Sequence, residues 1–238
     1  MAYVDRTDIM WKLKKRWFTG VNNLTIVTPS CWLEGLVKQS FLSHYPVKVI
    51  HNGIDSSMFK PSESNFREKY HCQDKFILLG VAFDWGIRKG LDIFISLAHE
   101  LDKRFQIILV GTNETIDTKL PRNVISIHRT QDQRELAEIY TAADLFVNPT
   151  REDNYPTVNM EALSCGTPVL TFKTGGSAEM LDETCGSIVP CDEMESLIKE
   201  IIRICEHRPY SSQTCIKKAE SFDMNERFLE YIELYRGV

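Results

Sequence analysis

Short apolar runs alternate with longer amphipathic stretches along most of this chain, and the alternation predicts strands separated by helices. The run at 76–83 (FILLGVAF) is apolar throughout, which indicates a strand buried on both faces. Between 91 and 101, apolar residues recur three or four positions apart, the spacing of a helix with one buried face. Strands are expected at 24–27, 47–50, 76–83, 105–110, 124–127, 145–147, 168–172 and 187–189. Helices are expected at 30–41, 91–101, 134–143, 157–166, 192–206, 213–221 and 225–235.

This order of elements defines the expected fold class. Strands joined by single helices require right-handed crossovers, so we expect an α/β fold with a doubly wound, Rossmann-like parallel sheet covered on both faces. In such sheets, ligands bind outside the carboxyl ends of the strands. Four polar loops are expected at that edge: 84–90 (DWGIRKG), 128–133 (HRTQDQ), 148–156 (NPTREDNYP) and 173–177 (KTGGS).

The first segment differs from the rest of the chain. Residues 9–18 (IMWKLKKRWF) combine aromatic and aliphatic residues with four basic ones, a pattern that predicts a short basic amphipathic helix. Such a helix either docks its aromatic side chains on another part of the protein or lies on an anionic membrane surface. The pattern leaves both interpretations open.

Composition narrows the class of protein. Of the 238 residues, 43% are hydrophobic, which is enough for the core of one large domain. The net charge of -5 gives no reason to expect a nucleic-acid partner. The seven cysteines lack disulfide or metal spacing, and no apolar run approaches the roughly 18 residues of a membrane helix. We therefore expect a soluble cytoplasmic protein with no metal site.

The stretch 148–179 carries the most informative pattern. An acidic loop opens directly onto the helix expected from Thr157, and a double glycine follows the next strand. The amino end of a helix binds anions through its free N–H groups and its dipole. With two carboxylates close by, this stretch predicts a site for a phosphate-bearing sugar.

These residues also resemble a known family. The segment 153–161 (DNYPTVNME), followed by ALSCGTPVLTFKTGGSAE, resembles the signature of retaining glycosyltransferases of family four, which have the GT-B fold. TPSCWLEGLVKQSF, VKVIHNGID, GIRKGLDIF and YTAADLFVNP resemble that family in the same order. The likeness is greatest to enzymes of capsule, lipopolysaccharide and exopolysaccharide biosynthesis.

The resemblance implies a domain organisation. GT-B enzymes have an amino-terminal acceptor domain and a carboxyl-terminal domain that binds the nucleotide-sugar donor, and this chain resembles the donor half. Residues 24–222 are then expected to form the Rossmann-like donor domain. Residues 1–23 resemble the end of an acceptor domain that is missing or supplied by a partner chain, and residues 223–238 form a helix that crosses back to it.

The resemblance also assigns roles to single residues. Lys89 matches the lysine that contacts the donor diphosphate. The family commonly has an arginine after a glycine at the end of the preceding strand, where this chain has Gly80-Val81-Ala82, so Arg88 is expected to supply that charge. Backbone amides of Thr157 and Val158 are expected to bind the same diphosphate. Glu161 matches the acid that binds the ribose hydroxyls.

Other residues of the loops complete the expected donor site. Asp153 stands at the position of the acid that contacts the sugar, but it is shorter than the usual glutamate and the neighbouring Glu152 is an alternative. The expected donor-binding residues also include Asn154, Tyr155, Pro156, Arg129, Thr130, Gly175 and Gly176. The two glycines either allow the backbone to approach the ligand or form an ordinary turn.

The resemblance implies transfer of a hexosyl unit, with retention, from a nucleoside-diphosphate sugar to a glycan or lipid-linked acceptor. No metal or other cofactor is expected, because cations and amides stabilise the leaving group. Two alternatives remain: a GT-B nucleotide-sugar epimerase, and a binding module without catalysis. Contact with the inner membrane surface is a further possibility.

Overall fold

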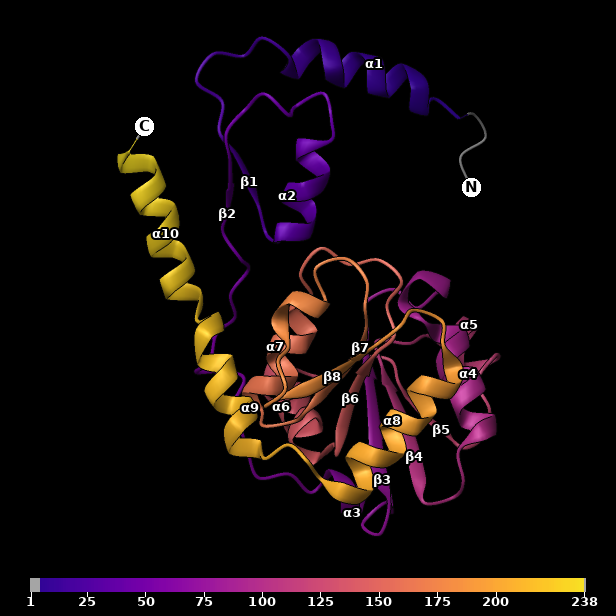
Figure 1. Ribbon diagram of the computed structural model, residues 1–238. Coiled ribbons are helices and arrows are strands. Elements are labelled where there is room, and N and C mark those ends of the chain that lie inside the picture. Colours follow the sequence, from indigo (N-terminus) through magenta and orange to yellow (C-terminus); the bar gives the residue numbers. More distant parts are fainter. Residues whose placement is uncertain (1–4, 238) are drawn as a thin grey trace.

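A six-stranded parallel sheet forms the larger part of the molecule, as the computed structural model of residues 5–237 shows (Figure 1). Its strands lie in the order β5-β4-β3-β6-β7-β8, and each neighbouring pair is parallel. This is the doubly wound order that the alternation of strands and helices predicted, so the expected fold class is confirmed. The strands are β3 (Phe76–Val81), β4 (Phe105–Val110), β5 (Val124–Ile127), β6 (Leu145–Asn148), β7 (Val169–Phe172) and β8 (Gly186–Val189).

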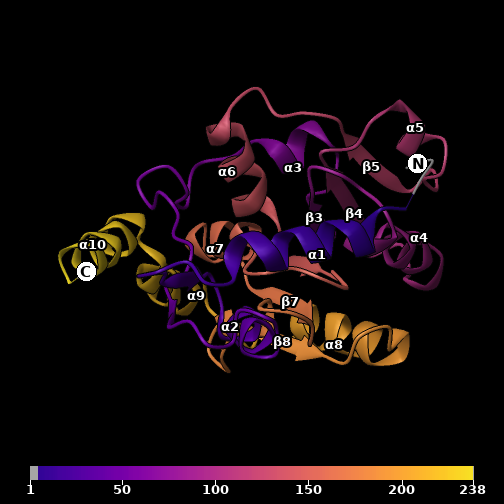
Figure 2. The same ribbon diagram turned by 90° about the horizontal axis from the view of Figure 1, so that it is seen from above.

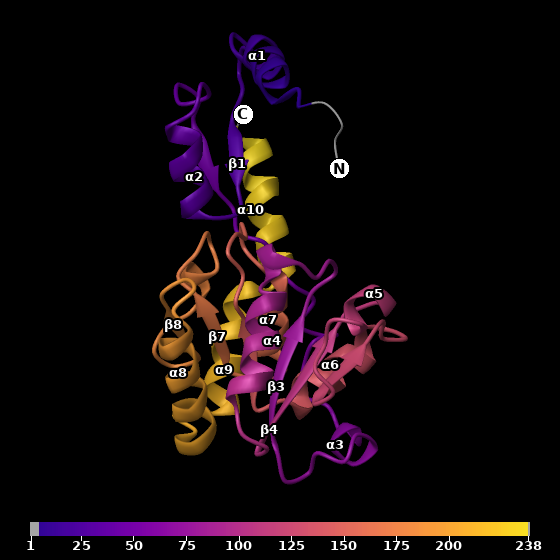
Figure 3. The same cartoon turned by 90° about the vertical axis from the view of Figure 1, so that its right-hand side faces the viewer.

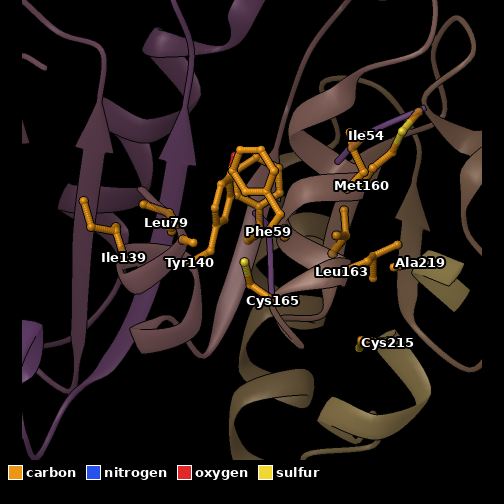
Figure 4. Close-up of a cluster of buried hydrophobic side chains, with 14 of the residues drawn as sticks. Ile54, Phe59, Leu79, Ile139, Tyr140, Met160, Leu163, Cys165, Cys215 and Ala219 are labelled. Atoms are coloured by element: carbon orange, nitrogen blue, oxygen red, sulfur yellow. The ribbon is translucent and has the colours of Figure 1, made fainter. Parts of the chain in front are cut away.

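Helices cover both faces of this sheet, because each presents an apolar stripe to it. The helices on one face are α4 (Leu91–Glu100) and α8 (Met194–His207). Those on the other face are α6 (Gln133–Ala142), α7 (Thr157–Ser164) and α9 (Ser212–Ala219). Figure 4 shows the second face, where Leu79 of β3 lies near Tyr140 of α6 and near Cys165, the residue after α7. Each face therefore has its own hydrophobic core.

A second, smaller unit lies beyond the carboxyl edge of the sheet (Figures 1 and 3). It contains β1 (Ile26–Thr28), α2 (Cys31–Lys38) and β2 (Val47–Val49), and its two strands pair in parallel with each other. The expectation that residues 24–50 belong to the main sheet was wrong. A strand, helix and parallel strand give the same local pattern whichever sheet they join, so periodicity did not separate the two cases.

Two further helices flank the smaller unit. The first, α1 (Thr7–Phe18), lies across its far end, and the last, α10 (Met224–Arg236), runs beside β1 and β2 (Figures 1 and 2). Gly53 fits α10 closely, because a Cβ there would lie 2.6 Å from the Cα of Met224. Within residues 5–237, no helix combines the length and apolar character needed to cross a membrane.

The remaining helical turns are short, and they connect the larger elements. They are α3 (Phe66–Lys69), α5 (Glu114–Asp117), η1 (Ile87–Lys89), η2 (Ala178–Met180) and η3 (Glu220–Phe222).

Candidate functional site

The direction in which the chain continues reverses at the centre of the sheet. It leaves β3 toward β4 on one side, whereas it leaves β6 toward β7 on the other. The loops 82–90 and 149–156 follow these two neighbouring strands, and we call the region outside the carboxyl ends of β3 and β6, where doubly wound folds bind ligands, the crevice. Both loops were predicted as parts of the site.

Backbone contacts join these loops to a third. The amide of Arg151 donates to the carbonyl of Arg88 at 2.9 Å. The hydroxyl of Thr174 donates to the carbonyl of Thr150 at 2.6 Å, and the amide of Gly176 donates to the carbonyl of Asp153 at 3.0 Å. The loops after β3, β6 and β7 thus form one connected surface, as the sequence predicted.

The two consecutive glycines are required by this contact between loops. Gly175 has φ +52°, and a Cβ on it would lie 2.0 Å from the carbonyl oxygen of Asp153. A Cβ on Gly176 would lie 1.9 Å from the carbonyl oxygen of Asn154. Any larger residue would push the loops apart. These glycines therefore allow the loop after β7 to approach the acidic loop closely.

The predicted cation and the predicted acid contact each other. Lys89 and Asp153 form a salt bridge in which the two side chains are 22% and 18% exposed. Glu152 points into solvent, and the exposed Arg88 lies 3.5 Å from the Glu152 carbonyl oxygen. Of the two acids that the sequence left open, Asp153 is the one that adjoins the lysine.

Helix α7 begins at the same surface. Pro156 occupies its N-cap position, and no side chain caps its first turn among the residues that the structure describes. The helix dipole and the N–H groups of Thr157 and Val158 consequently remain available to an anion. Thr157 is exposed, whereas the side chain of Val158 packs against the core. Of these two residues, only Thr157 has a side chain that is open to solvent.

Glu161 lies one turn further along α7. Its carboxylate accepts a 2.9 Å hydrogen bond from the hydroxyl of Tyr140, which is fully buried. Burial raises the pKa of Glu161, and hydrogen bonding to the hydroxyl of Tyr140 partly opposes that effect. Tyr140 therefore holds the carboxylate in place before any ligand binds.

The sheet-forming part of the chain matches a known family. Residues 74–207, more than half of the chain, match the family described as glycosyl transferases group 1. The chain belongs to this family. The match runs from the loop before β3 to the end of α8, so it contains the loops of the crevice.

Curated relatives of this chain are longer than it is. It is 24% identical to sulfoquinovosyl transferase SQD2 of Arabidopsis thaliana over 76% of this chain and 38% of that protein. It is 28% identical to the lipopolysaccharide glucosyltransferase WaaG of Escherichia coli over 62% of this chain and 42% of that protein. The chain spans less than half the length of these two relatives.

Solved structures share the fold of this chain. Sucrose-phosphate synthase of Thermosynechococcus elongatus superposes with a TM-score of 0.82 at 21% identity, over 98% of this chain and 62% of that one. Anabaena HepE, solved in complex with UDP-glucose, gives a TM-score of 0.79 at 18% identity, over 98% of this chain and 68% of that one. Both likenesses support the GT-B type of fold.

Tyr155 connects the sheet-forming part of the chain to the smaller unit. The ring is buried and stacks on His51 with centroids 4.5 Å apart, and its carbonyl accepts a 3.1 Å hydrogen bond from Asn52. Burial raises the pKa of Tyr155. The neighbouring Asn154 is exposed. The side chain of Tyr155 thus contacts the smaller unit instead of lining an open crevice.

Glu179 makes a contact that the sequence did not reveal. Its two carboxylate oxygens accept hydrogen bonds from the amides of Cys31 and Trp32, at 2.9 and 2.6 Å, at the start of α2. A carboxylate at this end of a helix satisfies free N–H groups and interacts favourably with the dipole. The only sequence signal was a glutamate three residues after the double glycine, and its partner lies 148 residues away.

The remaining predicted residues lie apart from these contacts. Arg129 and Thr130 follow β5, the outermost strand, and within residues 5–237 their side chains form no hydrogen bond with the other loops. Trp85, in the loop after β3, is buried, and its indole N–H donates to the carbonyl of Val110 at 2.9 Å. In the part of the chain that the structure describes, no group of three His, Cys, Asp or Glu residues is arranged to hold a metal.

Proposed function

We propose that the chain binds a nucleoside-diphosphate sugar in the crevice between the loops after β3 and β6. We further propose that it is the donor-binding part of a retaining hexosyltransferase whose acceptor is a glycan or a lipid-linked sugar. The observation that carries the proposal is the salt bridge between Lys89 and Asp153 beside the uncapped start of α7. A cation, free amides and a carboxylate in one crevice match the chemistry of a diphosphate joined to a sugar.

The chemistry follows from charge. Breaking a glycosyl-phosphate bond moves negative charge onto the leaving diphosphate, and fixed donors aimed at that charge lower the barrier. Lys89, Arg88 and the amides of Thr157 and Val158 supply these donors. Glu161 accepts hydrogen bonds from the ribose hydroxyls. Its hydrogen bond with Tyr140 orients the carboxylate before the ligand arrives. Asp153 contacts the transferred sugar, and Arg129 with Thr130 borders the base.

The domain organisation belongs to the same proposal. We assign the donor site to the part that starts at β3, and residues 1–23 and 223–238 to contacts with an acceptor-binding part. Support comes from the apolar side chains that α1 and α10 leave exposed, among them Trp17 at 59% and Tyr235 at 74%. The acceptor-binding part comes either from elsewhere in the same polypeptide or from a partner chain.

Titration calorimetry tests donor binding. UDP-glucose, GDP-mannose and ADP-glucose are titrated into the chain, and we expect one of them to bind with a micromolar to millimolar Kd. Lys89→Met should then weaken binding by about 10- to 100-fold, because a charge-assisted contact to phosphate contributes about 1.5–3 kcal/mol. Lys103→Met, at an exposed lysine before β4, is the control. Equal affinity in wild type and Lys89→Met would refute the proposal.

The exposed helix α1 suggests a contact with an anionic membrane surface. Its basic residues are Lys12, Lys14, Lys15 and Arg16, and Trp11 is 50% exposed. Basic charge with exposed aromatic rings favours binding at the headgroup level. Sedimentation with vesicles of 30% phosphatidylglycerol, compared with vesicles of phosphatidylcholine alone, tests this, and equal sedimentation would exclude the contact.

A further inference from the structure

Arg151 lies outside the set of residues that the sequence predicted, yet it connects three segments around the crevice. Its guanidinium donates to both carboxylate oxygens of Asp92 on α4, at 2.9 and 2.8 Å. It also donates to Asp192, in the loop after β8, at 2.8 Å, and to the carbonyl oxygen of Ile87. Its own backbone belongs to the acidic loop after β6.

Every nitrogen of this guanidinium donates a hydrogen bond, and its Nη2 forms an additional salt bridge with Asp192. Nε donates to Asp192, Nη1 donates to Asp92 and to Ile87, and Nη2 lies between Asp92 and Asp192 at 2.8 and 2.7 Å. A guanidinium has five such donors and no acceptor. A phosphate could therefore bind Arg151 only by displacing a carboxylate, so direct contact with the donor is disfavoured.

The segment that Arg151 holds is the turn η1, which carries Arg88 and Lys89. No side chain caps η1 among the described residues, and Ile87 is 72% exposed, so apolar packing contributes little to its position. The polar ties come from the acidic loop: Arg151 contacts the carbonyl of Ile87 through its side chain and the carbonyl of Arg88 through its amide. Both successive carbonyls of the turn are thus bound by one residue.

We infer that Arg151 is a positioning residue, which fixes η1 through Asp92 and Asp192 so that Arg88 and Lys89 face the crevice. This inference rests on the proposed function for its effect on ligand affinity. Without the contacts of Arg151, η1 samples other positions, and a diphosphate must order the turn when it binds. The effect is specific for ligands that reach the two cations.

The experiment compares Arg151→Met and Asp92→Asn with Arg104→Met. Arg104 is a matched control, because it also bridges two acids, Asp102 and Glu206, at the opposite edge of the sheet. UDP and UMP are titrated by calorimetry. We expect Arg151→Met to raise the Kd of UDP about tenfold, equivalent to about 1.4 kcal/mol. Asp92→Asn should raise it about threefold, while Arg104→Met leaves it unchanged.

The two ligands separate positioning from a general loss of structure. If Arg151 acts through η1, the Kd of UMP changes less than that of UDP in both variants. Equal losses for UMP and UDP, or UDP binding unchanged in both variants, would overturn the inference. So would tighter UDP binding in Asp92→Asn, since freeing the guanidinium would then have created a direct phosphate contact.

If UDP fails to bind the wild type, that result counts only against UDP as the ligand. Hydrogen exchange then tests the positioning role without a ligand. Amides of residues 86–90 should then exchange faster in Arg151→Met and in Asp92→Asn than in the wild type and in Arg104→Met. Unchanged protection of this turn in both variants would refute the positioning role on its own.

Discussion

The two parts of the molecule are held together by different forces. Helices α4, α6, α7, α8 and α9, which pack on the six-stranded sheet, each bury two to five side chains. Within the described residues, α1, α2 and α10 bury none. The sheet thus has cores of its own, whereas most apolar side chains of the smaller unit are only half-buried, and this unit contacts the sheet-forming part through polar and aromatic side chains.

Because of this difference, an amphipathic pattern has a different structural meaning in each part of the molecule. A helix of the sheet satisfies its apolar stripe within the same part of the chain, so its pattern reports the fold. The amphipathic α2 and α10 expose Leu36 at 44% and Phe228 at 55%. These exposed side chains fit the proposal that α10 contacts an acceptor-binding part.

The largest expected effect tests whether stability resides in the sheet. Phe146 of β6 is fully buried, so Phe146→Ala should lower the free energy of unfolding by about 3–5 kcal/mol. Trp17→Ala on α1 should change it by less than about 0.5 kcal/mol, since the side chain is mostly in solvent. Urea unfolding followed by circular dichroism measures both values, and similar losses in the two variants would contradict the comparison.

A smaller effect is expected at the connection between the parts. Glu179→Ala removes the acceptor of two amides at the start of α2, and loss of a helix cap costs about 1–2 kcal/mol. Hydrogen exchange should then quicken at Cys31 and Trp32 but remain unchanged in β3 and β6. Glu183→Ala, at an exposed position nearby, is the control. Faster exchange throughout the sheet would show that the two parts unfold as one.

The smallest expected effect concerns the buried acid of the site. Burial raises the pKa of Glu161 in the folded protein above its value in the unfolded chain. The stability linked to this shift is fully present below the unfolded pKa and is lost as the pH rises through the folded pKa. Glu161→Gln should therefore raise the free energy of unfolding by about 0.5–1 kcal/mol at pH 7. The advantage should disappear near pH 4, where the wild-type carboxyl is protonated.

Donor binding provides the second measurement on this variant. If Glu161 accepts hydrogen bonds from ribose, Glu161→Gln should weaken UDP more than 2′-deoxy-UDP, although the protein is more stable. Equal weakening of both ligands would remove Glu161 from the proposed ribose contact.

The sequence predicted the main sheet well because its signal is local. Continuous apolar runs mark β3 and β4 as buried strands, and the spacing of Leu91, Phe94 and Leu97 marks α4. The order of motifs along the chain predicted Lys89, Asp153 and Glu161 as site residues, and the structure shows that Lys89 and Asp153 contact each other. These features depend on neighbouring residues, so a single sequence contains them.

The parts that were not predicted depend on distant partners. Glu179 contacts Cys31 across 148 positions, and Arg151 contacts Asp92 across 59. Trp85 is an aromatic residue in a polar loop, and its burial against Phe94 depends on how the loop folds back. Pairing of β1 with β2 was missed for the same reason, since a short strand does not specify its sheet.

The salt bridge between Lys89 and Asp153 has a consequence for turnover under the proposed roles. With the sugar present, Lys89 pairs with the diphosphate while a sugar hydroxyl donates to Asp153, so both charges are satisfied. After transfer, the remaining nucleoside diphosphate satisfies Lys89 but leaves Asp153 without a donor. Re-forming the salt bridge then competes with the bound diphosphate, which favours release of the spent nucleotide over its retention.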